Sequence, residues 1–255
     1  MTLHSSKTIA PAVTAIAWSG SHWLIAYDDP SPAIAIVDAE MNLVRTIDIG
    51  GSSIHQLVVL DGIVFAIRTS GRTEAIEIRE DGIGVTHSTP LADGRVVVTS
   101  AHSALAFFNA GNAIEIASFT AAAGFGTATP LMSGRTVRDA IANDAGALLL
   151  HDDPSNALAV SEIIDGQVAS TSTVIADAGA NHEASLVLRR GGMIYTSDIP
   201  MPRGSIGRMD RPHPFGPFGI AAMGAIDTTS VVAWQDGPRI TIGTSAMPRS
   251  RTVRH

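Results

Sequence analysis

The residues best suited to chemistry in this sequence are three consecutive polar ones, Asn181, His182 and Glu183. An amide, an imidazole and a carboxylate are all groups that divalent cations accept as ligands, so the triplet is a candidate metal site. A complete site needs three or four ligands that converge from separate segments, and one triplet supplies only part of that set. We therefore predict no bound metal, and we expect these residues to line a hydrated channel or to cap a loop.

Further polar residues stand at the start of short apolar runs along the chain, namely His55, Arg95, Arg138 and Asp139. Such a position places a side chain at the end of a strand, where it can meet residues from other strands. The candidate channel residues are His55, Arg138, Asp139, Asn181, His182 and Glu183.

Several kinds of active site are excluded by composition and motif. The chain has no cysteine, which removes disulfides, thiolate metal sites and cysteine nucleophiles. It has no phosphate-binding glycine motif, no Gly-x-Ser-x-Gly elbow and no His-Glu-x-x-His pair. We predict no catalytic residue and no cofactor.

An internal repeat defines the elements that must position these residues. Residues 24–35 (LIAYDDPSPAIA) recur as residues 148–159 (LLLHDDPSNALA), an offset of 124 residues. That offset is three times about 41, the length of a four-stranded repeat unit. Intermediate copies occur around Thr69 and Ala110, each a turn between two apolar runs, which is a hairpin pattern.

Six hairpins can be assigned in this way, and each follows another short apolar run. The preceding runs cover residues 14–18, 55–60, 96–99, 137–141, 185–188 and 220–226. We interpret these as the innermost strands of six sheets, with outer strands at residues 43–49, 84–88 and 167–175. Radially packed sheets of this kind cover one another's apolar faces.

This pattern resembles the β-propeller superfamily over essentially the whole chain, and is nearest to the WD40-like and YVTN-like propellers. The resemblance is architectural, because the Gly-His and Trp-Asp dipeptides of WD40 repeats are missing. It implies an all-β fold, a six-bladed β-propeller of four-stranded antiparallel blades. It also implies that any chemistry would take place at the channel mouth, where the innermost strands begin.

The predicted domain is a single propeller over residues 1–255, with blades that start near residues 13, 54, 95, 136, 183 and 219. Closing the ring needs one more outer strand. Residues 7–10 resemble residues 45–48 of the first outer strand, and residues 251–254 are the alternative. We favour closure by the N-terminal strand, because it has the same phase as the other junctions.

The repeated Asp-Asp-Pro-Ser turns, at Asp28-Asp29 and Asp152-Asp153, admit a functional and a structural interpretation. A calcium site or a glycosidase carboxylate pair is the functional one. The structural one is favoured, because Asp caps turns through its side chain and Pro fixes the backbone angle. We predict that the two turns are equivalent hairpin tips three blades apart.

Charge limits the partners. The net charge is −7, which argues against general binding to nucleic acid or to anionic membranes. Residues 7–17 resemble a signal peptide weakly and match the repeat better, so we expect a cytoplasmic or virion-associated protein rather than a secreted one.

Two segments stand out from this acidic background, residues 189–219 and 247–255, which together hold eight of the sixteen arginines. The first also contains several prolines and two phenylalanines. Arginine and aromatic side chains are favoured anchors in protein interfaces. The predicted partner-binding residues are Arg189, Arg190, Arg203, Arg208, Arg211, Phe215, Phe218, Arg249, Arg251 and Arg254.

Two functions remain open at this stage. The first is a non-catalytic interaction or structural module with other protein subunits as partners, for example within a phage tail or virion. The second is a metal-dependent hydrolase, similar to six-bladed lactonases, that acts at the channel mouth through Asn181, His182 or Glu183.

Overall fold

The computed structural model describes residues 2–8, 13–28, 30–38, 42–143, 146–155, 157–175, 184–189, 192–197, 220–226, 229–236 and 239–246. Its side chains are described for residues 14–28, 30–38, 42–142, 146–155 and 157–173. These residues form strands and turns, and no helix that could cross a membrane occurs among them.

The first four sheets are antiparallel meanders in chain order. The first contains β2 (Val13–Trp18), β3 (Trp23–Tyr27), β4 (Ala33–Val37) and β5 (Leu43–Asp48). The second contains β6 (Ile54–Leu60), β7 (Ile63–Thr69), β8 (Thr73–Arg79) and β9 (Gly82–Thr89). The third contains β10 (Ala92–Ser100), β11 (Ser103–Ala110), β12 (Ala113–Thr120), β13 (Gly124–Phe125) and β14 (Thr129–Ser133). The fourth contains β15 (Val137–Asn143), β16 (Gly146–Asp152), β17 (Leu158–Ile164) and β18 (Gln167–Ile175).

Two more sheets complete the described part of the chain. The fifth is the pair β19 (Ala184–Arg189) and β20 (Gly192–Ser197). The sixth contains β21 (Ile220–Ile226), β22 (Thr229–Asp236) and β23 (Arg239–Ala246). Its fourth strand comes from the other end of the chain, because β1 (Thr2–Thr8) pairs antiparallel with β23.

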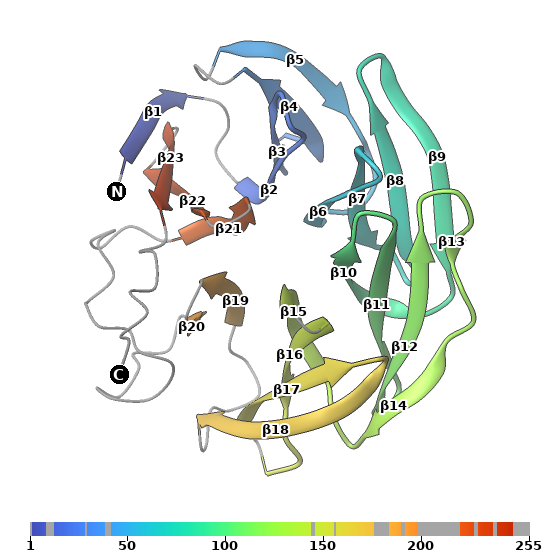
Figure 1. Cartoon of the computed structure of the whole chain (residues 1–255). Coiled ribbons are helices and arrows are strands. Elements are labelled where there is room, and N and C mark those ends of the chain that lie inside the picture. Colours follow the sequence, from blue (N-terminus) through green and yellow to red (C-terminus); the bar gives the residue numbers. More distant parts are fainter. Residues whose placement is uncertain are drawn as a thin grey trace.

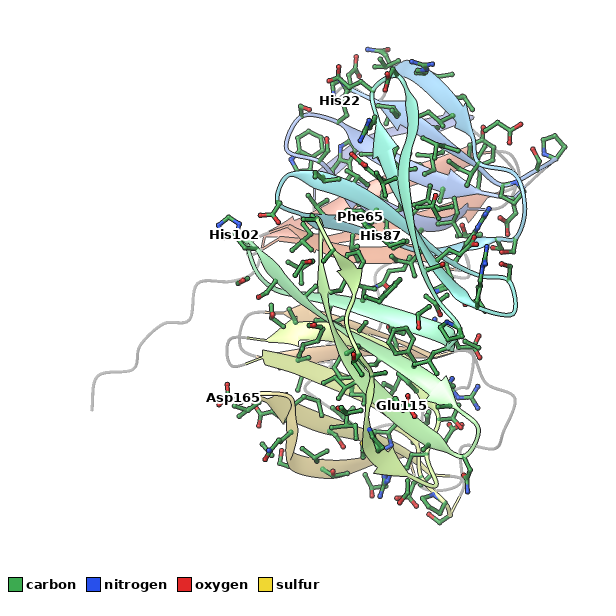
Figure 2. The ribbon with its side chains drawn as sticks, turned by 90° about the vertical axis from the view of Figure 1, so that its right-hand side faces the viewer. His22, Phe65, His87, His102, Glu115 and Asp165 are labelled. Carbon is green, nitrogen blue, oxygen red and sulfur yellow. The ribbon has the colours of Figure 1, made fainter. Side chains whose placement is uncertain are left out.

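The sheets stand around a common centre, with the first strand of each sheet innermost (Figure 1). Each innermost strand contacts the next one along the chain, from β2 through β6, β10, β15 and β19 to β21, which contacts β2. Figure 2 shows the sheets edge-on, with His102 and Asp165, both in hairpin turns, at one edge and Glu115 nearer the other.

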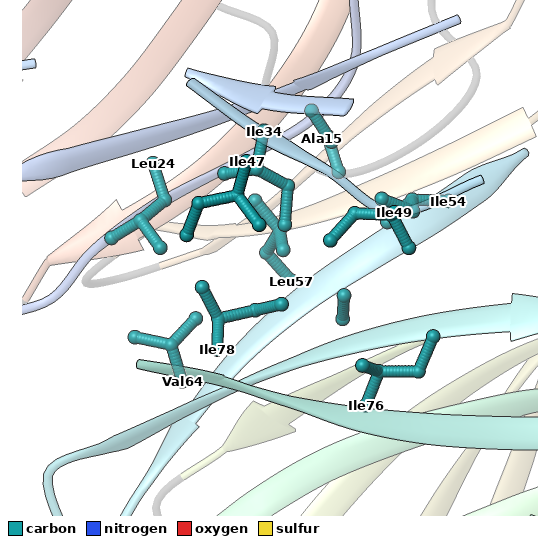
Figure 3. Packing of buried hydrophobic residues seen from close by; sticks show 12 residues of the cluster. Ala15, Leu24, Ile34, Ile47, Ile49, Ile54, Leu57, Val64, Ile76 and Ile78 are labelled. Atoms are coloured by element: carbon teal, nitrogen blue, oxygen red, sulfur yellow. The ribbon is translucent and has the colours of Figure 1, made fainter. Parts of the chain in front are cut away.

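The core lies between neighbouring sheets. In β7, Val64 and Ala66 pack towards the first sheet, and Phe65 and Ile67 pack towards the third, all of them buried. Because a sheet covered on both faces buries every side chain of its central strand, β7 has a continuous apolar run rather than an alternating one. Figure 3 shows the cluster between the first and second sheets.

Turn chemistry fixes the strand register at two hairpins. Asp61-Gly62 joins β6 to β7 and Asp165-Gly166 joins β17 to β18, and all four residues have positive φ. Two residues with positive φ form the turn whose twist matches a β-hairpin, and Asp-Gly is a preferred pair for it.

The predicted strands agree closely with the observed ones in the first four sheets, with one omission. The third sheet has an outer edge in two pieces, β13 and β14, which both pair with β12. No strand was predicted there, because Gly, Ser, Thr and Pro interrupt the apolar pattern of residues 121–134. The sequence also predicts a strand at residues 205–209, which would follow residues 193–196 in the fifth hairpin, and this segment lies outside the described residues.

The two Asp-Asp-Pro-Ser turns join β3 to β4 in the first sheet and β16 to β17 in the fourth. They are therefore equivalent turns three sheets apart, as the near-identity of the two segments predicts.

Candidate functional site

A β-bulge recurs where the innermost strands begin. The pairing of the first strand with the second shifts by one residue at Thr14, His55, Arg138 and Ala221, and over Asp93-Gly94 in the third sheet. A bulge re-aims the side chain of its extra residue and is common next to binding sites. We call this end of the sheets, which also carries the turns between second and third strands, the bulge end.

His55 is the bulge residue of the second sheet. Its Nε2 lies 2.9 Å from the carbonyl oxygen of Gly94 in the third sheet, so the ring donates this hydrogen bond. Burial, and then the positive charge of Arg95, lower the pKa of His55 from 6.5 to about 4. His55 is therefore neutral at pH 7, with its Nδ1 lone pair unprotonated.

Arg95 and Asp139 hold equivalent positions in neighbouring sheets, since each is the first paired residue after its bulge. Asp139 accepts a hydrogen bond of 2.9 Å from the backbone N–H of Ala140. Burial lowers the pKa of Arg95, and the carboxylates of Asp139 and Asp93 act in the opposite direction. The structure thus brings His55, Arg95 and Asp139 to one part of the bulge end.

Arg138 pairs with Asp152 in the adjacent strand and not with Asp139, its neighbour in sequence. Its Nε lies 3.0 Å from both carboxylate oxygens of Asp152, and its Nη2 lies 2.7 Å from Oδ2. This forked contact joins the start of β15 to the end of β16, so Arg138 braces the fourth sheet.

The next aspartate, Asp153, caps the turn that follows. Its Oδ1 accepts hydrogen bonds from the backbone N–H and the hydroxyl of Ser155, at 3.0 and 2.7 Å. These bonds hold the pKa of Asp153 below its usual range. Arg135 lies 3.3 Å from the other carboxylate oxygen. The structural interpretation of the Asp-Asp-Pro-Ser turn is confirmed at this residue.

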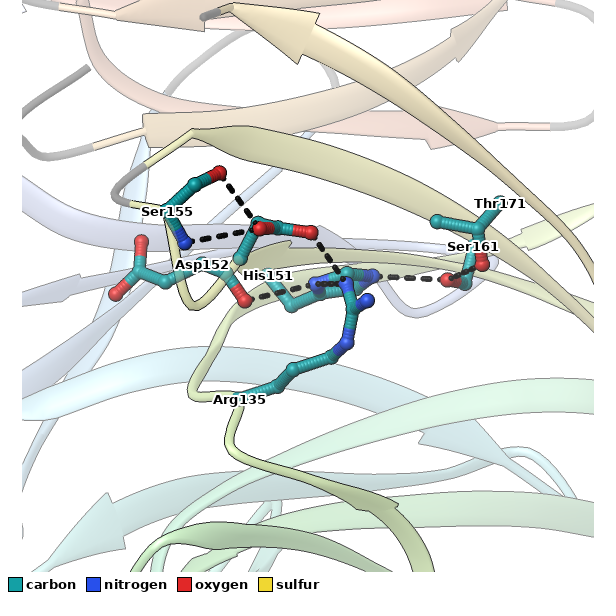
Figure 4. Close-up of polar contacts among 7 residues, drawn as sticks. Arg135, His151, Asp152, Ser155, Ser161 and Thr171 are labelled. Carbon is teal, nitrogen blue, oxygen red and sulfur yellow. Dashed lines mark hydrogen bonds and ion pairs between the residues drawn. The ribbon is translucent and has the colours of Figure 1, made fainter. Parts of the chain in front are cut away.

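A chain of polar contacts that runs from the buried His151 to the exposed Thr171 in the same sheet was missed at the sequence level (Figure 4). His151 donates from Nδ1 to the Asp152 carbonyl oxygen, at 3.0 Å. Its Nε2 lies 2.8 Å from the Ser161 hydroxyl, which in turn lies 2.7 Å from the hydroxyl of Thr171. The Ser–His contact resembles that of a hydrolase, but both side chains are fully buried and no substrate can reach the Ser161 oxygen. The signal for this chain was a histidine inside an apolar run, where the first copy of the repeat has Tyr27.

At the bulge end of the first and second sheets, unlike that of the fourth, several buried polar atoms of the described residues lack a hydrogen-bond partner. Within the described side chains, four buried polar atoms have no hydrogen-bond partner: Thr14 Oγ1, Asp28 Oδ1, Ser52 Oγ and Thr69 Oγ1. Buried polar groups are normally hydrogen-bonded, so these atoms mark where, among the described side chains, such groups lack a partner.

The remaining predicted residues cannot be placed. Asn181, His182 and Glu183 lie outside the described residues, as do Arg190, Arg203, Arg208, Arg211, Phe215, Phe218, Arg249, Arg251 and Arg254. Arg189 ends β19, and its side chain is not described. Among the described residues, no group of three or more His, Asp or Glu side chains could hold a metal ion.

Solved structures with the same arrangement of sheets place the fold. The propeller of Dos1 superposes on this chain with a TM-score of 0.57 at 11% sequence identity, covering 92% of this chain and 78% of the Dos1 chain. The chain has a β-propeller fold. At this identity the similarity defines the architecture and leaves the function open.

A second similar structure is the β-propeller domain of Cps50 (Swd1) from Myceliophteria thermophila. It superposes with a TM-score of 0.43 at 13% identity over 56% of this chain and 51% of that domain. No family model and no curated protein matches the sequence. The function of this propeller must therefore be inferred from its own residues.

Proposed function

We propose that this β-propeller is a non-catalytic module that binds other proteins. The observation that carries the proposal is the repeated bulge, one backbone feature that recurs at the same end of five sheets. The residues in it differ from sheet to sheet, among them Thr14, His55 and Arg138. A constant frame that presents varied side chains is suited to recognition of an asymmetric partner, whereas catalysis needs reacting groups in fixed relation.

Composition supports the same proposal and names a second contact region. Residues 189–219 and 247–255 hold half of the arginines of an acidic chain. Arginine stays charged and offers forked donors, which suits a specific carboxylate-bearing partner. Proline restricts its backbone angle, so a proline-rich segment is expected to lose less conformational entropy on docking.

The direct test replaces Arg203, Arg208 and Arg211 together with alanine. Partners are captured from the source cells by cross-linking, and the affinity of each identified partner is then measured for both proteins. We expect the triple variant to bind at least about tenfold more weakly, the loss of a few charge-assisted contacts. The matched control is the triple alanine variant at Arg45, Arg72 and Arg79, which removes the same charge from exposed positions in the first two sheets.

Equal affinity of the Arg203, Arg208 and Arg211 variant and the wild type would remove these residues from the interface. A hydrolytic activity lost on Glu183→Ala would replace the module with the enzyme hypothesis. The narrowest form of the proposal, a subunit of a phage tail or virion, stays a hypothesis that the identity of the captured partner tests.

For the architecture, we propose one domain over residues 1–255, with six blades that start near residues 13, 54, 95, 136, 183 and 219. Closure by the N-terminal strand is supported by the pairing of β1 with β23. Deleting residues 1–11 should expose the edge of β23 and lower the melting temperature on the order of 10 °C. A truncated protein that melts like the full chain contradicts this closure.

A further inference from the structure

Arg95 begins the regular pairing of β10 with β11, opposite Phe107, directly after the bulge over Asp93-Gly94. The innermost strands on both sides of β10 are β6 and β15, and both contact it. Arg95 therefore stands at the bulge end, between the second and the fourth sheets.

The guanidinium of Arg95 is poorly satisfied. Its one hydrogen bond in the described part of the chain runs from Nη1 to the carbonyl oxygen of Gly94, at a long 3.3 Å. Its side chain is only partly exposed, and none of its other donors is among the fully buried, unpartnered atoms of the described side chains. A part-buried arginine with five donors and one weak bond has the capacity to bind a ligand.

The groups around Arg95 act on its charge through space, because Asp139 and Asp93 are near enough to raise its pKa against the lowering by burial. His55, which lies close enough to be affected by that charge, is neutral at pH 7 and donates its own proton to Gly94. Asp139 is engaged by the backbone N–H of Ala140, and Asp93 is exposed to solvent. Neither carboxylate forms an ion pair with Arg95 within the described residues. In the next sheet, by contrast, Arg138 forms an ion pair with Asp152.

We propose that Arg95 is a binding residue for a carboxylate of the protein partner. The planar guanidinium offers parallel N–H donors that match the two oxygens of a carboxylate, and a part-buried setting strengthens such a contact. This proposal rests on the proposed function and adds to it the chemistry that the bulge end recognises. His55 is a positioning residue here, since it holds the Gly94 carbonyl next to the guanidinium.

The experiment uses the full-length protein and two small probes that differ only in charge, N-acetyl-aspartate amide and N-acetyl-asparagine amide. The imidazole signals of His55, assigned with the His55→Gln variant, are followed by NMR as each probe is added. A carboxylate bound to Arg95 offsets the charge that helps to lower the pKa of His55. We expect the aspartate probe to shift the His55 signals in the millimolar range and to raise its pKa above about 4.

Two charge-matched variants complete the design. Arg95→Gln should abolish the response to the aspartate probe, and Arg72→Gln should retain it, because Arg72 is paired with Glu74 at the turn after β7. Identical responses to the two probes, or an unchanged response in Arg95→Gln, would overturn the proposal. If Arg95→Gln does not fold, the comparison of the two probes on the wild type still decides. Because the probes need no partner, a negative result here leaves the interaction module itself intact.

Discussion

The bulge end of the fourth sheet and that of the first sheet share a turn sequence but satisfy their polar groups differently. Arg138 and Asp152 in the fourth sheet hold the positions of Thr14 and Asp28 in the first. The fourth sheet forms a forked ion pair there, with contacts of 2.7 to 3.0 Å. In the first sheet the threonine is too short to reach, and one buried atom of each residue has no partner.

The second sheet repeats the contrast with other residues. Ser52 and Thr69 occupy the positions of Arg135 and Asp152, and their buried hydroxyls have no partner among the described residues. The difference shows that the repeat specifies the backbone at the bulge end. The side chains of each individual sheet determine whether its polar groups are paired internally. An internally paired end braces the propeller, whereas an unpaired end leaves buried polar atoms without a hydrogen bond.

The largest effect is expected when the paired end is broken. Arg138→Ala leaves the carboxylate of Asp152 part-buried and without its main partner, which should lower the free energy of unfolding by about 2 kcal/mol. Denaturant unfolding measures this loss. The control is Arg79→Ala, which removes an exposed pair with Glu77 and should cost under about 1 kcal/mol. Equal losses for both variants would mean that the pair in the fourth sheet does no bracing.

Low pH should destabilise the protein through the buried imidazoles of His55 in the second sheet and His151 in the fourth. The pKa of His55 is about 4 in the folded protein and 6.5 ordinarily, so protonation favours the unfolded state. This contribution is complete above pH 6.5 and is lost as the pH falls towards 4, about 2 kcal/mol of it by pH 5. Burial lowers the pKa of His151 as well, with the same sign. Melting temperatures at pH 7 and pH 5 check this, and His55→Gln should reduce the difference between them. If the His55→Gln variant and the wild type show the same loss, His55 is not a source of it.

Two threonines at one turn give an isosteric test within the second sheet. Thr73 Oγ1 accepts a hydrogen bond of 2.9 Å from the backbone N–H of Gly94, and its ladder partner Thr69 has an unpartnered hydroxyl. Thr73→Val should lower the free energy of unfolding by about 1 to 2 kcal/mol, because it removes the acceptor. Thr69→Val should be neutral or slightly stabilising, since no bond is lost. A loss of similar size for Thr69→Val would show that its hydroxyl is satisfied.

Much of the fold could be predicted from the sequence, because hairpins with turn residues and apolar alternation are local signals. The near-identity of residues 24–35 and 148–159 also gave the spacing of the sheets. The bulges could not be predicted, since an extra residue such as Thr14 leaves no mark in the apolar pattern. The split outer edge formed by β13 and β14 was missed for a related reason, because its residues are short and polar.

The positions of several candidate residues could be predicted, whereas their contacts could not. His55, Arg138 and Asp139 lie at the beginnings of β6 and β15, and their role at a channel mouth stays a prediction. Arg138 forms an ion pair with Asp152, whereas Arg95 forms a single long hydrogen bond among the described residues. This difference depends on distances between strands, which cannot be read from the sequence. The buried contact of His151 with Ser161 depends likewise on the register between β16 and β17.

Transplanting the arginine of the fourth sheet into the first tests most directly whether the unpaired end lacks only a partner. Thr14→Arg should give Asp28 the forked contact that Asp152 receives, and should raise the free energy of unfolding by about 1 kcal/mol. The same substitution in an Asp28→Asn background should give no gain, so a double-mutant cycle isolates the pair. A Thr14→Arg variant that is not stabilised, or whose free energy of unfolding rises equally in both backgrounds, would contradict the view that Asp28 lacks only a cationic partner.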